Sequence, residues 1–359
     1  LDDISGFDET RRQLLTQALE RGVTSIREAA AVELDSLTDY TAIQQARKEG
    51  LAAIEQAYTA AAGKLKKLLE SSRAENGWDG ITASRPHGSG TEADPYQIGT
   101  AQELAWLAYA VNNQTESGGF SAVLTADIVL NDGTFDENGR YTRGESGMWL
   151  SEWTPMGQYE RTSTAPEGYG GTFDGQGHTI TGLYVSTNAE NTYASGLFAQ
   201  LTGSAVVQNV TVTGYIYVHG VGGGNVGGIA GEANGAAIRN CRNLCDIRLN
   251  KVDGSLGGVQ INAGGIAGSS SGTIENCRND GTLRTIAPND DIGTMGRVGG
   301  IVGMSDRGTI RGGVNTGTIS GGISRDPKGR HGMGGILGVS FDASLIQDCY
   351  NTGSIQEEG

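Results

Sequence analysis

Short apolar runs recur in the last third of the chain at one fixed spacing. Four of these runs begin with isoleucines that are separated by 36 residues each: Ile238, Ile274, Ile310 and Ile346. An apolar position between glycines precedes each of them, at Ile229, Ile266, Ile301 and Ile336. A third apolar position follows, at Ile247, Leu283, Ile319 and Ile355. Period-two alternation within the runs favours β-strands, and a constant period of this size predicts stacked supersecondary units.

Each repeat is therefore predicted to hold three short strands. A single repeat has too few apolar side chains to offset the entropy of its own chain. When repeats stack, the isoleucines form columns, and each fully buried one contributes roughly 1.5–3 kcal/mol. The separation between the first and second runs varies while the total stays constant, which predicts a solenoid with adjustable corners. A looser copy begins at Gly196, so repeats of about 36 residues are expected from 196 onward.

Two further columns of small or polar residues support stacking. Amides placed one above another can hydrogen-bond along a stack of strands, and the repeats align four of them: Asn243, Asn279, Asn315 and Asn351. Glycines follow two residues later in most copies, where we expect a corner with positive φ: Gly214, Gly281, Gly317 and Gly353. Cys245 takes the glycine place in one repeat, and the sequence offers no reason for it.

The first 75 residues have a different pattern. Apolar residues recur at three- and four-residue spacing, which predicts an α-helical hairpin or a three-helix segment over 1–75, interpreted as a spacer domain. Residues 76–95 are rich in Gly, Ser and Pro and predict a linker. Thr100 and Glu103 form a capping-box pattern that predicts a helix over 100–112, capping the N-terminal end of a β-helix domain at 96–359.

Composition narrows the class of protein. Glycine accounts for 59 of 359 residues without a collagen period, and only 6% of residues are aromatic, which suits a thin-cored solenoid. The formal net charge of −15 argues against nucleic acid or an anionic membrane as partner. No apolar run is long enough to span a bilayer. The chain starts at Leu1 without an apolar signal segment, and we expect a signal and an anchor to lie outside the given sequence.

Three of the four cysteines share one repeat position, and the fourth is Cys245. We interpret Cys241, Cys277 and Cys349 as small apolar residues of one interior column, reduced rather than paired. Neighbours in a stack lie about 4.8 Å apart, so a Cys241–Cys277 disulfide remains an alternative.

The order of motifs from 95 to 359 resembles bacterial surface proteins that carry GLUG-type repeats. The residues concerned include Tyr96-Gln-Ile-Gly-Thr-Ala-Gln-Glu, Trp153-Thr-Pro-Met-Gly, Gly171-Thr-Phe-Asp-Gly-Gln-Gly-His, Gly-Gly-Ile-Ala-Gly and Ile-x-Asn-Cys-x-Asn. The resemblance implies a secreted or wall-attached protein with a right-handed parallel β-helix similar to the pectate-lyase scaffold. Such repeats also accompany zinc peptidases that cut immunoglobulin A. This chain has no His-Glu-x-x-His, and His87, His178, His219 and His331 are isolated, so that activity does not carry over.

A polysaccharide lyase or glycosidase is the enzymatic alternative. Hydrolysis would need two carboxylates about 5–9 Å apart, which Asp174 and the acids of 127–152 could supply. Asp174 stands in a Phe-Asp-Gly-Gln-Gly turn, where aspartate commonly bonds its own backbone. The repeat strands carry no row of acids. We therefore expect no catalytic residue, no cofactor and no metal, and no enzymatic activity.

One insert loosely matches a calcium loop. Thr134, Asp136 and Asn138 fall at the first, third and fifth positions, with Gly139 sixth and Glu145 twelfth. The first position is not Asp and no helix clearly flanks the segment, so a polar hairpin turn is the favoured interpretation. Asp2, Asp3 and His178 are expected to be solvated terminal or turn residues.

The variable corners predict a binding edge, because all of them follow the third strand of a repeat: 217–227, 248–263, 284–298 and 320–333. They carry the charged residues Lys251, Asp253, Arg284, Asp290, Asp291, Arg297, Arg325, Lys328 and Arg330. Loops on one side of a repeat scaffold are the usual binding surface. We expect a monomeric, extracellular, non-enzymatic adhesin that binds glycan or host protein. An inert spacer remains the third alternative.

Overall fold

The computed structural model describes residues 78–359, except 114–118, 137–138, 145–146, 148, 158–167, 189–193, 221–223, 252–258, 287–293, 322–331 and 358–359. Six earlier positions are also described, all of them helical: 20, 24, 48, 51, 52 and 56. The predicted helical hairpin or three-helix segment otherwise lies outside the described residues. The chain divides into two compact units, Leu1–Asp79 with Arg143–Trp149, and Gly80–Thr142 with Leu150–Gly359. The first division falls inside the predicted linker.

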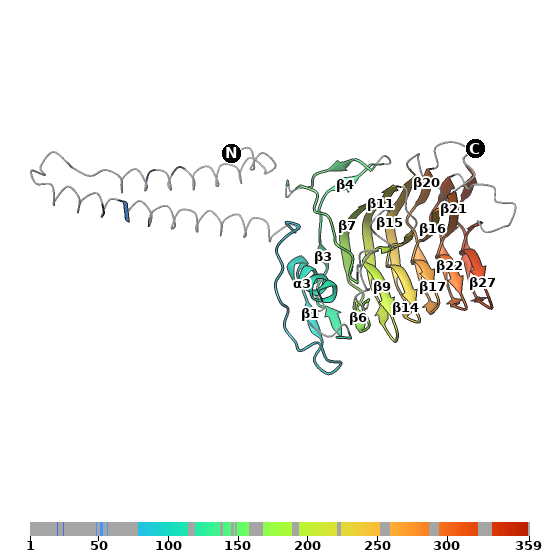
Figure 1. Ribbon diagram of the computed structural model, residues 1–359, viewed down its shortest axis with the longest axis horizontal. Coiled ribbons are helices and arrows are strands. Elements are labelled where there is room, and N and C mark those ends of the chain that lie inside the picture. Colours follow the sequence, from blue (N-terminus) through green and yellow to red (C-terminus); the bar gives the residue numbers. More distant parts are fainter. Residues whose placement is uncertain are drawn as a thin grey trace, which may run out of the picture. The chain divides into compact units, whose positions relative to one another are not determined.

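The second unit is a right-handed parallel β-helix (Figure 1). Its coils stack on one another, and the strands of successive coils form four parallel sheets that run along the stack. Sheet 1 contains β1 (Tyr96–Ile98), β2 (Ala122–Leu124), β6 (Thr172–Asp174), β10 (Val206–Gln208), β14 (Ala237–Arg239), β18 (Thr273–Glu275), β23 (Thr309–Arg311) and β28 (Leu345–Gln347). Sheet 2 contains β3 (Ile128–Val129), β7 (Thr179–Asn188), β11 (Thr211–Gly220), β15 (Arg242–Lys251), β19 (Arg278–Asn279), β20 (Leu283–Ile286), β24 (Val314–Asn315), β25 (Ile319–Gly321), β29 (Tyr350–Asn351) and β30 (Ile355–Glu357).

Two shorter sheets, which begin at β8 (Ala194–Ser195) and β9 (Phe198–Thr202), complete the later coils. Sheet 3 contains β8 (Ala194–Ser195), β12 (Gly224–Gly227), β16 (Val259–Gly264), β21 (Thr294–Gly299) and β26 (Gly332–Gly334). Sheet 4 contains β9 (Phe198–Thr202), β13 (Ala230–Asn234), β17 (Ala267–Ser270), β22 (Val302–Asp306) and β27 (Leu337–Phe341). The prediction of three strands per repeat was therefore wrong, because the repeats contribute strands to four sheets. The Gly-Gly-Ile motif is a corner between two strands, because Gly228 and Ile229 separate β12 from β13.

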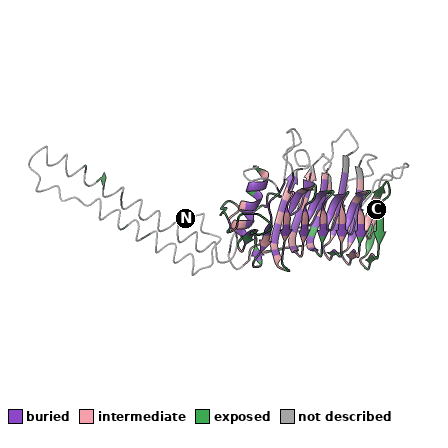
Figure 2. Cartoon of the chain, turned by 90° about the horizontal axis from the view of Figure 1, so that it is seen from below, coloured by how far each residue is buried: buried purple, intermediate pink, exposed green. Residues whose placement is uncertain are grey.

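The predicted isoleucine column is confirmed. Ile238 pairs with Ile274, Ile274 with Ile310, and Ile310 with Ile346, each in a parallel ladder. The first three are at most 1% exposed, whereas Ile346 is 47% exposed. Ile346 belongs to the last described coil, and Figure 2 shows exposed residues in the strands near the C-terminus. The column is thus buried wherever another coil covers it.

A helix lies beside β1, at the end of the stack opposite β27 (Figure 1). Helix α3 spans Ala101–Asn112, and Thr100 and Glu103 form the capping box that the sequence indicates. Leu104, Leu107 and Val111 are buried on its inner face. The side chain of Asn112 ties the helix to the first coil, donating to Pro155 O and accepting from Gly157 N.

Positive φ occurs at a different corner from the predicted one. Left-handed backbone recurs between sheets 1 and 2, just after the isoleucine strands, at Asn209, Asn240, Asn276, Gly312 and Asp348, with φ between 51° and 63°. These are residue types that tolerate that region. The predicted glycine column has positive φ only at its first member, Gly214.

The glycine column is needed for close approach instead. A Cβ on Gly281 would lie 2.0 Å from Cys245 O, and one on Gly317 would lie 1.9 Å from Gly281 O. Cys245 keeps the hydrogen bonds of this corner, since its N–H donates to Asn243 Oδ1 at 3.0 Å.

We predict that replacing Asn276 by glycine leaves the thermal midpoint nearly unchanged, because glycine adopts φ of 52° freely. Valine at the same place should lower the free energy of unfolding by about 1–2 kcal/mol, because a branched Cβ clashes in the left-handed region. Thermal and denaturant unfolding of both variants measure this. Equal losses in the two variants would contradict the assignment.

Candidate functional site

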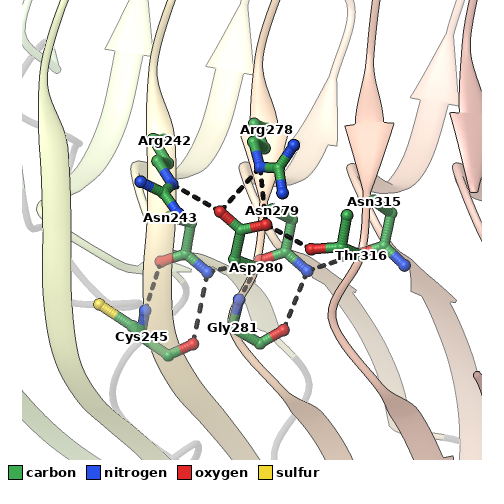
Figure 3. A network of polar contacts seen from close by, with 9 residues as sticks. All are labelled: Arg242, Asn243, Cys245, Arg278, Asn279, Asp280, Gly281, Asn315 and Thr316. Atoms are coloured by element: carbon green, nitrogen blue, oxygen red, sulfur yellow. Dashed lines mark hydrogen bonds and ion pairs between the residues drawn. The ribbon is translucent and has the colours of Figure 1, made fainter. Parts of the chain in front are cut away.

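An asparagine ladder runs along the interior of sheet 2. The side-chain amide of Asn243 donates to Asn279 Oδ1 at 2.8 Å, Asn279 to Asn315 at 2.7 Å, and Asn315 to Asn351 at 2.6 Å. The first three side chains are fully buried. Each amide also reaches a backbone carbonyl of its own corner, as Asn279 does to Gly281 O at 3.0 Å (Figure 3). The predicted amide stacking is confirmed, and its role is structural.

Asp280 joins three coils on the outer face next to this ladder (Figure 3). Its carboxylate accepts from Arg242 Nε at 2.5 Å, from Arg278 Nε at 2.7 Å and from the hydroxyl of Thr316. Burial alone would raise the pKa of this carboxyl, but the hydrogen bonds from Arg278, Thr316 and Arg242 lower the pKa to about 2. This network therefore holds a charged carboxylate in place at neutral pH.

The carboxylates proposed for catalysis are held in turns. Asp174 accepts from Gln176 N at 2.9 Å, and also from the side chains of Gln208 and Asn209. This confirms the turn interpretation. Asp127 accepts from Thr179 N at 2.9 Å and lies 3.1 Å from His178 Nδ1. This pair could not be anticipated from the sequence, because 51 residues separate its members.

The calcium-loop segment forms a hairpin among the residues that the structure describes. Strands β4 (Thr134–Phe135) and β5 (Tyr141–Thr142) pair antiparallel. Asp136 closes the turn, since its Oδ1 accepts from Arg140 N at 2.9 Å. The polar-hairpin interpretation is confirmed, although Asn138 and Glu145 lie outside the described residues. Within the described part of the chain, no group of three or more His, Cys, Asp or Glu could hold a metal ion.

The predicted binding edge is only partly described. Strands β11, β15 and β20 extend into the ranges assigned to corners. Arg297 was expected on this edge, but it is only 3% exposed. Its guanidinium lies 4.7 Å above the ring of Phe341 and donates to Asn262 Oδ1 at 3.3 Å. Several of the other charged residues lie outside the described residues: Asp253, Asp290, Asp291, Arg325, Lys328 and Arg330.

Arg297 ends a buried polar line between sheets 3 and 4. Asn262 donates to Asn225 Oδ1 at 2.6 Å, and Asn225 donates to the carboxylate of Glu232. Burial raises the pKa of Glu232 despite amide donors from Asn234, Asn225 and Gln200. The line satisfies buried polar groups from three coils, as a close-packed interior requires.

A row of rings lies on the outer face of sheet 2, and the sequence analysis missed it. We call it the ring row: Phe135, Tyr184, Tyr215, Tyr217 and His219. Phe135 of the hairpin stacks on Tyr184 with centroids 5.6 Å apart and on Tyr215 at 5.0 Å. Tyr217 follows at 6.5 Å from Tyr215, and His219 lies 5.3 Å from Tyr217.

The hairpin covers one part of the ring row and leaves another part accessible. Tyr215 is only 6% exposed, and a Cβ on Gly139 would lie 2.3 Å from its hydroxyl oxygen. Tyr217 and His219 are half-buried. The one signal in the sequence was the period-two pattern Tyr215-x-Tyr217-x-His219, which places three rings on one face of a strand.

Arginines continue the line of Tyr217 along the stack. Tyr217 pairs with Arg248, and Arg248 pairs with Arg284. We call these two residues the arginine column. Asn250 donates to the hydroxyl of Tyr217 at 3.1 Å. Burial raises the pKa of Tyr215, and the neighbouring Arg248 opposes that rise. Rings and guanidinium groups thus share one ordered surface.

The four cysteines are free thiols. Cys241 and Cys277 are buried, and their hydrogens point to backbone carbonyls, from Cys241 to Arg239 O at 3.2 Å and from Cys277 to Glu275 O at 3.3 Å. Burial raises the pKa of Cys241, which disfavours the reactive thiolate. This agrees with the reduced interior column that the sequence predicts.

Comparison with known proteins gives two limited similarities. No protein-family model matches the chain. Halomucin of Haloquadratum walsbyi is 29% identical over 180 residues, which cover 49% of this chain and 2% of Halomucin. A candidate immunoglobulin A1 protease from Bacteroides ovatus has a TM-score of 0.45 at 20% identity, covering 77% of this chain and 80% of its own. Neither similarity assigns an activity. In the described part of the chain, no helix is long and apolar enough to cross a membrane.

We predict that Asp280 makes stability depend on acid pH. Its folded pKa is depressed to about 2 from 3.8, so its contribution is complete above about pH 4 and is lost as pH falls toward 2. Asp280→Asn should cost about 1–2 kcal/mol at pH 7, allowing for solvent screening, and much less at pH 2.

Melting midpoints of the native protein and the variant across pH 2–7 measure this difference. Asp342→Asn is the matched control, because the Asp342 side chain is 73% exposed and lies 3.9 Å from Arg307. A loss in Asp280→Asn that stays constant over this pH range would contradict the assignment.

Proposed function

We propose that this chain is a non-enzymatic binding scaffold of a secreted or cell-surface protein. In this proposal, the β-helix presents an adhesive surface to a glycan or an extracellular protein, and the chain acts as a monomer. The observation that carries the proposal is the ring row beside the arginine column on the outer face of sheet 2. Rigid rings with polar tips supply contact area at low entropic cost, and arginine is common at the centre of interfaces.

The arrangement of the acids supports binding over catalysis. A retaining or inverting glycosidase needs one carboxylate with a raised pKa beside a second, ionised carboxylate. Asp174, Asp127 and Asp280 all have lowered pKa values and engage turn or network partners. Glu232 has a raised pKa, but amides surround it in a buried position. Fold alone does not supply the chemistry of a lyase or a peptidase.

The GLUG-type motifs favour a repetitive extracellular protein, and the partial similarity to a protein named Halomucin is compatible with this. The strongly acidic composition argues against nucleic acid as the ligand. An inert spacer would not need ordered rings on its outer face, which favours a ligand.

We predict selective retention of at least one glycan or extracellular protein on an array. The protein should release no oligosaccharide from plant or mucin polysaccharides and should leave immunoglobulin A intact. Arrays probed with labelled protein, together with product analysis by mass spectrometry, measure both. Soluble oligosaccharide products would replace this proposal with the enzymatic alternative, and an array without hits would favour the spacer.

A further inference from the structure

The outer face of sheet 2 differs in charge from the rest of the chain. On β15, β19, β20 and the adjoining corner, outward positions hold four arginines and two aspartates: Arg242, Arg248, Arg278, Arg284, Asp246 and Asp280. Among the residues that the structure describes, this surface therefore carries two more basic than acidic groups, in a chain whose formal net charge is −15. Such a local reversal of sign attracts an anionic ligand by electrostatic complementarity.

The two aspartates of this surface already have partners. Asp280 accepts from Arg242 and Arg278, so these three groups form one network. Asp246 accepts from Thr282 N at 3.2 Å. The arginine column lies on the other side of Asp246 from this network, in line with Tyr217. Its charge is therefore placed next to the accessible end of the ring row.

We infer that Tyr217, His219 and the arginine column bind an anionic glycan that runs along the stack axis. This inference rests on the proposed binding function and specifies its ligand class. The apolar face of a pyranose packs on an aromatic ring, and a planar guanidinium pairs with carboxylate or sulfate through two parallel hydrogen bonds. The aromatic ring of Tyr217 and the guanidinium groups of the arginine column lie in one line along the stack.

The geometry of the stack fits a linear polymer. Successive coils place Tyr217, Arg248 and Arg284 about 4.8 Å apart, which is close to the length of one sugar residue. One ring and two guanidinium groups can thus contact three consecutive residues. Asn250 supplies a polar side chain next to His219, because these two residues pair in the same ladder.

The two ends of this line differ in charge: one lies beside an acidic residue and the other beside a neutral one. Toward β7, Tyr217 pairs with Ser186, whose N–H donates to the carboxylate of Glu152 at 3.2 Å. Toward β25, Arg284 pairs with the neutral Ser320. An anionic chain is repelled by Glu152 and is therefore expected to extend from Tyr217 toward Arg284.

The test uses pairs of glycans that differ only in charge. An oligouronate is compared with its methyl ester, and a sialylated glycan with its desialylated form, by calorimetry or surface plasmon resonance at low and high salt. We expect the charged member of at least one pair to bind about tenfold more tightly or better, with the difference shrinking in high salt.

Substitutions locate the site. Arg248→Gln with Arg284→Gln should abolish the charge preference, and Tyr217→Ala should weaken binding about tenfold, whereas Tyr217→Phe retains the ring and most of the affinity. The matched controls are Arg239→Gln with Arg311→Gln on sheet 1, and Tyr109→Ala on α3. Melting curves confirm that every variant is folded.

The outcomes separate this inference from the proposed function. Equal binding of charged and neutral glycans, or binding that ignores the substitutions in the ring row and the arginine column, overturns the anionic-glycan site and leaves a binding scaffold. Binding only to a protein has the same consequence. Failure to bind any glycan or protein overturns both.

Discussion

The asparagine ladder is the interaction on which the rest of the β-helix depends. A buried polar group that lacks a partner costs about 1–3 kcal/mol, so each buried asparagine is fully satisfied when the next coil supplies an amide oxygen in addition to the carbonyl of its own corner. The ladder also restricts the residues that pack against it to glycine, because a Cβ would clash with the asparagine side chains. A Cβ on Gly228 would lie 2.0 Å from Asn243 Oδ1, and one on Gly335 would lie 2.4 Å from Asn351 Cγ. The Gly-Gly-Ile motif and the asparagine column are therefore two halves of one packing arrangement.

A stack held this way gives the outer face of sheet 2 its regularity. Since the interior residues keep a fixed register, outward residues of successive coils also lie in line, which places Tyr217, Arg248 and Arg284 in one column. The hairpin of β4 and β5 is an insertion into this pattern, and Phe135 packs on two rings of the sheet. The scaffold thus carries a surface with its own chemistry without any change to its core.

The repeating interior could be predicted from the sequence because the same packing requirement recurs in every repeat and selects the same type of residue each time. Ile238, Ile274 and Ile310 occupy the same environment, so their spacing revealed the stack. Glycines were harder to interpret, because a missing Cβ serves both a left-handed backbone and a close approach. Positive φ was therefore assigned to Gly281 and Gly317, whereas Asn240 and Asn276 adopt it. The fourth strand was missed because the apolar residues on the two sides of the Gly-Gly-Ile corner were interpreted as one continuous strand.

Contacts that occur only once in the structure could not be predicted from the repeat pattern. Phe135 meets Tyr215 only because an insert folds back on the sheet, and Asp127 meets His178 across two coils. Arg297 was expected on the binding edge because it lies in the variable corner 284–298, but it is buried and donates to Asn262 in a line of buried amides. The most direct test of the account is a double-mutant cycle on Asn279→Ala and Asn315→Ala, measured by denaturant unfolding. The ladder predicts a coupling energy of at least about 1 kcal/mol, whereas losses that add within about 0.5 kcal/mol would contradict it.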